Sequence, residues 1–177
     1  GYGNKKGKGG NSIATYNYED SYFTETARDN YNHDLARMSL RLALSAFAYH
    51  GKGDERYTNQ DKNARKLLTD IGFGGDNGKA IDSVGYTTEP SVNSIGAIAG
   101  HKKVTYGDKE YTLIALAIRG GNYESEWGGN FNVGTGVEHK GFSEGRKKVL
   151  DFLSYYINDK KISGDVKLWI TGYSRAA

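Results

Sequence analysis

An uninterrupted apolar segment, Leu113–Ile118 (LIALAI), constrains the fold of this 177-residue chain more than any other feature. It is much shorter than the roughly 18 apolar residues that indicate a membrane-spanning helix. A strand with one solvated face alternates apolar and polar residues, whereas this segment is apolar at every position. It therefore predicts a central strand in a sheet that is covered by helices on both faces.

Three other segments carry apolar residues at the spacing of one helix face, which predicts three helices. They run from about Tyr31 to Gly51, from Asp61 to Ile71 and from Ser143 to Asn158. Asn32 and Ser143 are candidate N-caps, and Gly72 is a candidate helix end.

Strand patterns complete the predicted sheet. Ser94–Val104 and Tyr111–Ile118 are joined across Tyr106-Gly107-Asp108, which predicts a hairpin. Val166–Thr171 follows the last helix, so strand, helix and strand form a crossover unit and a parallel pair. The order of elements predicts an α/β fold.

The composition limits the domain organisation and the class of function. Residues 1–12 are rich in glycine and lysine and hold no aliphatic side chain, so we expect a flexible tail, followed over residues 13–177 by the N-terminal part of a single domain. The net charge of +3 is spread along the chain, which argues against a nucleic-acid partner. The absence of cysteine excludes disulfides, thiolate metal sites and a cysteine nucleophile.

The carboxyl end of the last predicted strand carries the strongest chemical signal. The sequence GYSRA, residues 172–176, follows VKLWIT and has the form G-x-S-x-A, a relative of the nucleophile elbow. The sharp turn of an elbow accepts only small residues two positions before and after the serine, as at Gly172 and Ala176. The same turn directs the backbone N–H of Arg175 toward a developing oxyanion. Ser174 is therefore the candidate nucleophile.

A second serine motif competes with this assignment, and three histidines are considered and declined as the base of Ser174. The sequence GFSEG around Ser143 matches G-x-S-x-G more literally, but it follows a polar stretch, so Ser143 is better explained as a helix cap. Three histidines, His33, His50 and His101, precede Ser174 and are expected to be solvated or satisfied by hydrogen bonds.

Four short motifs follow one another in a characteristic order. They are Arg119-Gly120-Gly121 after LIALAI, then Glu126-Trp127, then HKGF at residues 139–142, and finally GYSRA. Over residues 31–177 this order resembles the class 3 lipases, the fungal triglyceride-lipase-like branch of the α/β-hydrolases. The resemblance implies a mostly parallel α/β-hydrolase-type sheet with helices on both faces, here interrupted after the elbow.

The resemblance also implies roles for individual residues. Ser174 would be the nucleophile, and the backbone N–H groups of Gly121 and Arg175 would form the oxyanion hole, although the family has threonine or serine at Gly121 and glycine at Ala176. The supporting residues would be Arg119, which braces the oxyanion loop, together with His139, Gly172 and Ala176, and the pocket would be lined by Trp127, Phe131 and Tyr173. His139 corresponds to a structural histidine, because the catalytic acid and base follow the serine in this family.

The expected activity is the cleavage of carboxylic esters, lipid or small and soluble, through an acyl-enzyme, without metal or cofactor. Because three residues follow Ser174, we expect the acid and base in a C-terminal remainder of the same protein or in a completing chain. The isolated chain would then be a poor hydrolase and would expose an apolar strand edge. The alternative is a non-catalytic module that binds a polysaccharide or protein partner. The compartment stays open, with a secreted or cell-surface location favoured.

Overall fold

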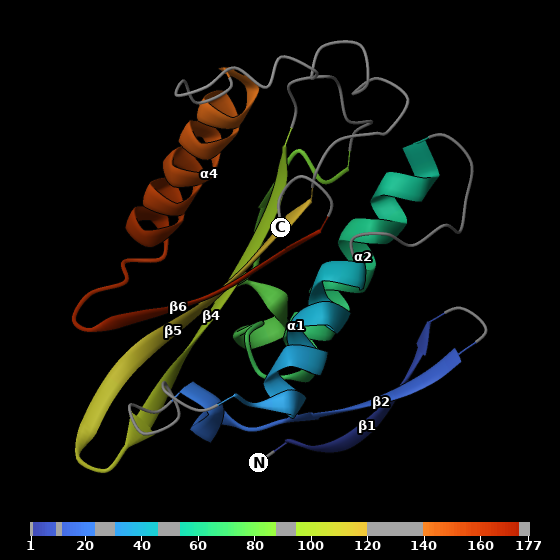
Figure 1. Ribbon diagram of the computed structural model, residues 1–177. Helices are drawn as coiled ribbons and strands as arrows, with labels where there is room; N and C mark the ends of the chain where they lie inside the picture. Colours follow the sequence, from blue (N-terminus) through green and yellow to red (C-terminus); the bar gives the residue numbers. More distant parts are fainter. Residues whose placement is uncertain are drawn as a thin grey trace.

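The computed structural model describes residues 2–9, 12–23, 31–45, 54–87, 95–119 and 140–173. Its main body is a four-stranded sheet with helices on both faces (Figure 1). In spatial order the strands are β3 (Asp82–Val84), β4 (Gly96–Tyr106), β5 (Lys109–Arg119) and β6 (Val166–Tyr173).

The sheet is mixed, so the predicted α/β-hydrolase-type, mostly parallel sheet is wrong. β3 and β4 are antiparallel, β4 and β5 are antiparallel, and β5 and β6 are parallel. A tight turn at Gly107-Asp108 joins β4 to β5 and forces them to run in opposite directions. A parallel pair requires a long crossover, and among the described strands only β5 and β6 are joined by one. The predicted hairpin and the predicted parallel pair are both confirmed.

β5 is the central strand that its apolar sequence predicts. Residues 111–117 are all buried, and their side chains alternate between two apolar clusters on the opposite faces of the sheet. One cluster contains side chains of α1 (His33–Ser45) and α2 (Asp54–Asp70), and the other contains side chains of α4 (Lys140–Asp159). The two faces are thus covered separately, by α1 and α2 on one side and α4 on the other (Figure 1).

The helix ends follow local signals in part. The Oδ1 of Asn32 accepts a hydrogen bond from the Leu35 amide at 2.9 Å, which confirms the predicted N-cap of α1. Gly72 has φ +94° and follows α2, where the amide of Phe73 donates to the carbonyl of Leu68, as in a Schellman cap. α4 begins at Lys140, so Ser143 lies within the helix and the prediction that it is the N-cap is wrong.

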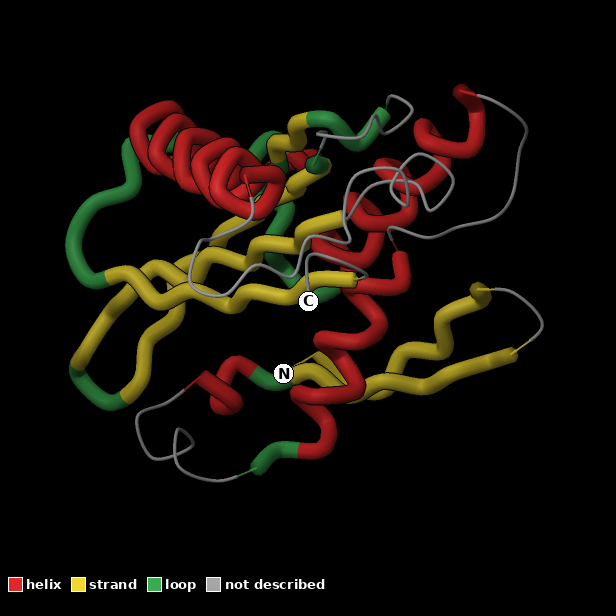
Figure 2. The backbone as a smooth tube through the Cα atoms, turned by 45° about the horizontal axis from the view of Figure 1, so that its top comes forward, coloured by secondary structure: helices red, strands yellow, loops and turns green. Residues whose placement is uncertain are grey.

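A hairpin occupies the region where the composition predicts a flexible tail. β1 (Tyr2–Gly9) pairs antiparallel with β2 (Ser12–Tyr18), and the hairpin lies beside α1 (Figure 2). Its ladder consists of backbone hydrogen bonds, which a glycine- and lysine-rich segment can make without apolar side chains. Tyr18, at the end of β2, is buried with Trp169 and Phe73, which ties the hairpin to the main core. The expectation of one domain over residues 13–177 stays a prediction.

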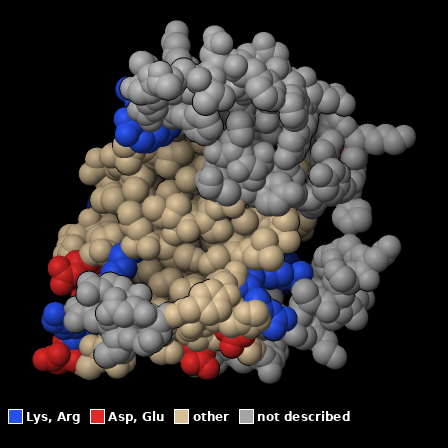
Figure 3. All heavy atoms as spheres, in the orientation of Figure 1, with Lys and Arg blue, Asp and Glu red and all other residues tan. Residues whose placement is uncertain are grey.

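β6 is an edge strand of the described sheet. On one face it is anchored to α1, because Trp169 Nε1 donates to Ser39 Oγ and Thr171 Oγ1 donates to the Ser39 carbonyl, both at 2.9 Å. On the other face Leu168 and Ile170 are exposed, Ile170 by 55%. In the view of Figure 3, Lys, Arg, Asp and Glu lie mostly in the lower half and along the left side of the described surface, and the central tan surface carries few charges.

None of the described helices is long and apolar enough to span a bilayer.

Candidate functional site

Three of the predicted site residues lie in the part of the chain that the structure describes. Arg119 is the last residue of β5, and Gly172 and Tyr173 are the last two residues of β6. The others lie outside the described residues, namely Gly121, Trp127, Phe131, His139, Ser174, Arg175 and Ala176. The roles that the resemblance implies for these seven residues stay predictions.

The carboxyl ends of β5 and β6 lie side by side. In the parallel ladder Ile118 is the Cα partner of Gly172, and Arg119 is the Cα partner of Tyr173. Adjacent strands are about 4.8 Å apart. The strands β5 and β6 therefore end at neighbouring points, at Arg119 and Tyr173. In sheets with parallel strands, ligands bind at such carboxyl ends.

A buried guanidinium lies at this end of β5. Arg119 is 2% exposed, and its Nη1 donates to Gln60 Oε1 at 2.7 Å and to the Tyr86 carbonyl at 2.9 Å. Its Nη2 donates to the Gly85 carbonyl. The guanidinium carbon lies 5.4 Å from the centre of the Tyr57 ring and 5.1 Å from that of Tyr86, within the range of cation–π attraction.

These contacts connect Arg119 to two elements that precede it in sequence. The guanidinium donates to two backbone carbonyls, those of Gly85 and Tyr86, which belong to the segment after β3. Bracing of the Gly120-Gly121 loop involves residues outside the described part and stays a prediction.

The electrostatics of the cluster favour a charged arginine beside a neutral phenol. Burial lowers the pKa of Arg119, while the nearby Tyr86, Tyr57 and Asp61 raise it. Arginine stays protonated in proteins despite such shifts. Burial also raises the pKa of Tyr86, and its hydroxyl has no hydrogen-bond partner among the described residues. This end of the sheet therefore contains a buried cation and a buried neutral donor.

Gly96 leaves the space that this cluster occupies. A Cβ at Gly96 would lie 3.0 Å from Tyr86 Cδ2, 3.1 Å from the Gly85 carbonyl oxygen and 3.2 Å from Arg119 Nε. Such distances are tighter than most side-chain contacts in proteins. Glycine at this position of β4 thus permits the close approach of Arg119 and Tyr86 to the sheet.

The buried face of α2 is polar in one half of the helix and apolar in the other. Its carboxyl-terminal half buries apolar side chains, namely Ala64 and Leu68, whereas its amino-terminal half buries Tyr57, Gln60 and Asp61. Buried polar groups are costly unless they are hydrogen-bonded, and they concentrate here at one end of the sheet. The polar half of α2 therefore belongs to the candidate site and the apolar half to the core.

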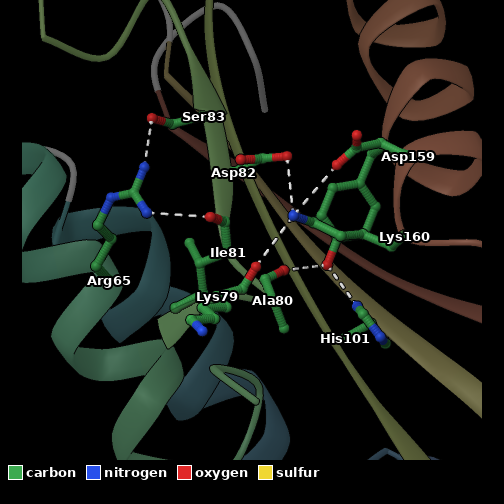
Figure 4. Close-up of polar contacts among 10 residues, drawn as sticks. Arg65, Lys79, Ala80, Ile81, Asp82, Ser83, His101, Asp159 and Lys160 are labelled. Carbon is green, nitrogen blue, oxygen red and sulfur yellow. Dashed lines mark hydrogen bonds and ion pairs between the residues drawn. The ribbon is translucent and has the colours of Figure 1, made fainter. Parts of the chain in front are cut away.

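A second polar network connects α2 to β3. Arg65 Nε contacts Asp61 Oδ2 at 2.7 Å, and Ser83 Oγ donates to Asp61 Oδ1 at 2.8 Å. Arg65 also donates to the Ile81 carbonyl and to Ser83 Oγ, both at 3.1 Å (Figure 4). Since both oxygens of Asp61 are engaged in this way, the network has a structural role.

A third polar cluster lies between β4 and α4. His101 Nδ1 is 2.7 Å from the hydroxyl of Tyr156, which donates to the Ala80 carbonyl. The tyrosine has one proton to donate, so the imidazole carries its proton on Nδ1 and donates to Tyr156. His101 is thus satisfied by a hydrogen bond, as expected from the sequence.

Lys160 completes this cluster from the end of α4. It donates to the Lys79 carbonyl at 3.0 Å and lies 3.3 Å from the carboxylates of Asp82 and Asp159 (Figure 4). Burial first, and then the charge of Lys160, lower the pKa of His101. Together these contacts hold the 79–82 segment against α4.

In the described part of the chain, no group of three or more His, Asp or Glu side chains lies close enough together to bind a metal ion. Asp61, which alternates with Asn59 and Asn63 like the start of a calcium loop, is instead bound to Arg65 and Ser83.

Sequence reasoning identified Arg119 but missed its partners. Gln60 and Tyr57 lie just before the predicted start of the second helix at Asp61, whereas α2 begins at Asp54. A signal was present, because Tyr57, Ala64 and Ile71 repeat at seven-residue intervals on one helix face. Tyr86 lies in an irregular segment that carries no comparable pattern.

Comparison of the chain with protein-family models, with curated proteins and with solved structures finds no match. The interpretation of the site therefore depends on its own residues and geometry.

Proposed function

We propose that this protein is a serine hydrolase that cleaves carboxylic esters, with Ser174 as the nucleophile. The observation that supports this proposal most directly is the parallel register of β5 and β6, which makes Arg119 and Tyr173 partners at the same end of the sheet. Arg119, the first residue of R-G-G, thus lies beside Tyr173, the residue that precedes Ser174 in the sequence. An acyl-transfer site needs this kind of proximity, because the nucleophile and the oxyanion donors act on the same carbonyl group.

The proposed reaction uses two displacements. Ser174 Oγ attacks the ester carbonyl carbon while a general base accepts the hydroxyl proton, and the tetrahedral oxyanion is bound by the backbone N–H groups of Gly121 and Arg175. The C–O bond to the alcohol then breaks, and the alcohol leaves with the proton. Water attacks the acyl-enzyme in the same way and releases the carboxylic acid. The base and its acid partner are expected after Ser174 in sequence, as the resemblance to class 3 lipases implies.

The contacts of Arg119 are consistent with a supporting role in this reaction. Its side chain connects the end of β5 to α2 and to residues 85–86, and a rigid strand end favours a preorganised oxyanion hole. Trp127, Phe131 and Tyr173 remain the proposed walls of the acyl pocket.

The test is the intact mass of the natural full-length product before and after reaction with a fluorophosphonate probe. We expect one adduct, which is lost in Ser174→Ala and kept in Ser143→Ala. Ser143→Ala is the matched control, because Ser143 occupies the competing G-x-S-x-G motif. An adduct that persists in Ser174→Ala would exclude Ser174 as the nucleophile.

A natural product that forms no adduct would contradict the hydrolase proposal. The remaining explanation would be the non-catalytic module for a polysaccharide or protein partner.

A further inference from the structure

We propose that Gln60 is a positioning residue for the carboxyl end of β5, acting through Arg119. This inference rests on the proposed function for its catalytic consequence, since Gly121, the proposed oxyanion donor, follows Arg119 by two residues. Gln60 does not contact the reacting atoms in this proposal. It binds the guanidinium of Arg119, and the guanidinium in turn fixes the position of the end of β5.

The contact itself is short and buried. Gln60 is 3% exposed, and its Oε1 accepts from Arg119 Nη1 at 2.7 Å. A hydrogen bond with a charged donor is stronger than one between neutral groups, and removing its acceptor in a buried site leaves a costly unsatisfied donor. The position of Gln60 is therefore coupled to that of the guanidinium.

Three acceptors of the guanidinium among the described residues belong to two different parts of the chain. Two of them are backbone carbonyls of residues 85 and 86, whereas Gln60 Oε1 is a side-chain acceptor from α2. The bond to Gln60 joins residues 59 positions apart and connects α2 directly to the end of β5. A substitution can remove this connection and leave the two carbonyl contacts in place.

The neighbouring residues make the guanidinium sensitive to such a change. The rings of Tyr57 and Tyr86 lie near it, and Gly96 leaves little free space beside it. A side chain packed this closely moves together with its backbone. Loss of the acceptor at Gln60 is therefore expected to shift Arg119 and the peptide that follows it, and small displacements of catalytic groups reduce rates strongly.

The experiment compares four variants of the natural full-length product. Gln60→Leu removes the acceptor, Gln60→Asn keeps an amide but shortens its reach, and Gln60→Glu keeps an acceptor at the same reach. Ser83→Ala is the matched control, because it weakens another contact of α2 without touching Arg119. The unfolding midpoint, the maximal rate of fluorophosphonate labelling at Ser174 and the amide hydrogen exchange of Gly120 and Gly121 are measured for each.

We expect the folded Gln60→Leu and Gln60→Asn proteins to be labelled about tenfold more slowly at saturating probe. Gln60→Glu and Ser83→Ala should keep the wild-type rate. Amide exchange at Gly120 and Gly121 should accelerate in the same two variants that lose labelling. A lower unfolding midpoint with unchanged labelling and exchange would show a merely structural role and overturn the proposal.

Failure of the proposed function gives a different result. If the wild-type protein forms no adduct, the amide exchange rates alone test whether Gln60 positions the end of β5. Faster exchange at Gly120 and Gly121 in Gln60→Leu, with wild-type exchange in Gln60→Glu, would still support Gln60 as the positioning residue, and unchanged exchange would refute it.

Discussion

Arg119 shows how a buried charge can be accommodated at the end of a strand. Its guanidinium is surrounded by backbone carbonyls, an amide oxygen and two aromatic rings. Burying a charge is costly unless hydrogen bonds replace its hydration. Arginine suits this position because its planar group holds five N–H donors in a fixed arrangement and packs against aromatic rings, whereas the lysine ammonium is a compact charge with three donors.

The close packing around Arg119 predicts opposite effects for two glycine substitutions. Gly96→Ala should destabilise the protein by about 1 to 3 kcal/mol, because its Cβ would lie 3.0 to 3.2 Å from Tyr86, Gly85 and Arg119. Gly145→Ala is the control in α4, where the nearest heavy atom, Ile95 Cδ1, is at an ordinary 3.6 Å. It should stabilise the helix by up to about 1 kcal/mol. Denaturant unfolding of both variants checks the two signs, and a neutral Gly96→Ala would contradict the tight packing.

The lowered pKa of His101 predicts that part of the free energy of unfolding depends on pH. Its pKa is below the ordinary 6.5 in the folded protein, so the unfolded chain binds more protons in the interval between the folded pKa and 6.5. The free energy of unfolding should therefore rise with pH through this interval and level off above it. Protonation is opposed by burial and by Lys160, while Tyr156 keeps accepting from Nδ1 in either state.

The measurement is denaturant unfolding of the wild type and of His101→Gln between about pH 5 and pH 8. The variant should lose less stability on acidification than the wild type. Equal pH dependence in the two proteins would rule out a contribution from His101.

At the scale of elements, short-range signals predicted most of the fold. Asn32 and Gly72 mark real helix boundaries because capping depends on residues within one turn. The hairpin of β4 and β5 follows from apolar runs on both sides of a glycine turn, and β5 is central because it is apolar on both faces. The patterns were less informative for β1, whose glycine- and lysine-rich sequence lacks a strand pattern, and for the start of α4, which begins at Lys140, before the candidate cap Ser143.

The cap of α1 gives a prediction at this scale. Asn32→Ala should reduce the free energy of unfolding by about 1 kcal/mol, because the amide of Leu35 loses its acceptor. Asn32→Asp keeps an oxygen acceptor at the same place and should retain the wild-type stability. Thermal or denaturant unfolding distinguishes the two, and equal losses in both variants would argue against the capping bond.

At the scale of the whole molecule, the direction of the strands was the main error. A crossover helix before β6 correctly predicts one parallel pair, but the mostly parallel sheet that the resemblance implied is overturned by the antiparallel pairing of β4 with both β3 and β5. Of the candidate site, Arg119 could be found because it follows a recognisable strand. Its partners Gln60 and Tyr86 could not be found in this way, because they are separated from Arg119 by 59 and 33 positions in the sequence. Such contacts depend on tertiary packing, which local patterns do not encode.

The exposed side of β6 predicts self-association. Leu168 and Ile170 are exposed on the edge strand of the described sheet, and an apolar edge offers unpaired backbone groups to another chain. Leu168→Lys should therefore reduce concentration-dependent association in sedimentation experiments and leave the unfolding midpoint nearly unchanged. Leu40→Lys on α1, where the leucine is exposed but not on a strand, is the control and should associate like the wild type. Equal behaviour of the two variants would exclude the strand edge as the cause.

The parallel pairing of β5 and β6 also sets an order of assembly. β4 and β5 are separated by a two-residue turn, so their ladder closes a short loop, whereas β6 pairs with β5 after the intervening residues 120–165. Closing a longer loop costs more chain entropy, and non-local pairings form more slowly. During synthesis the β4–β5 hairpin emerges first, and the register of Arg119 with Tyr173 is established only once β6 is available. The two strand ends on which the proposed chemistry depends are therefore brought together late in folding.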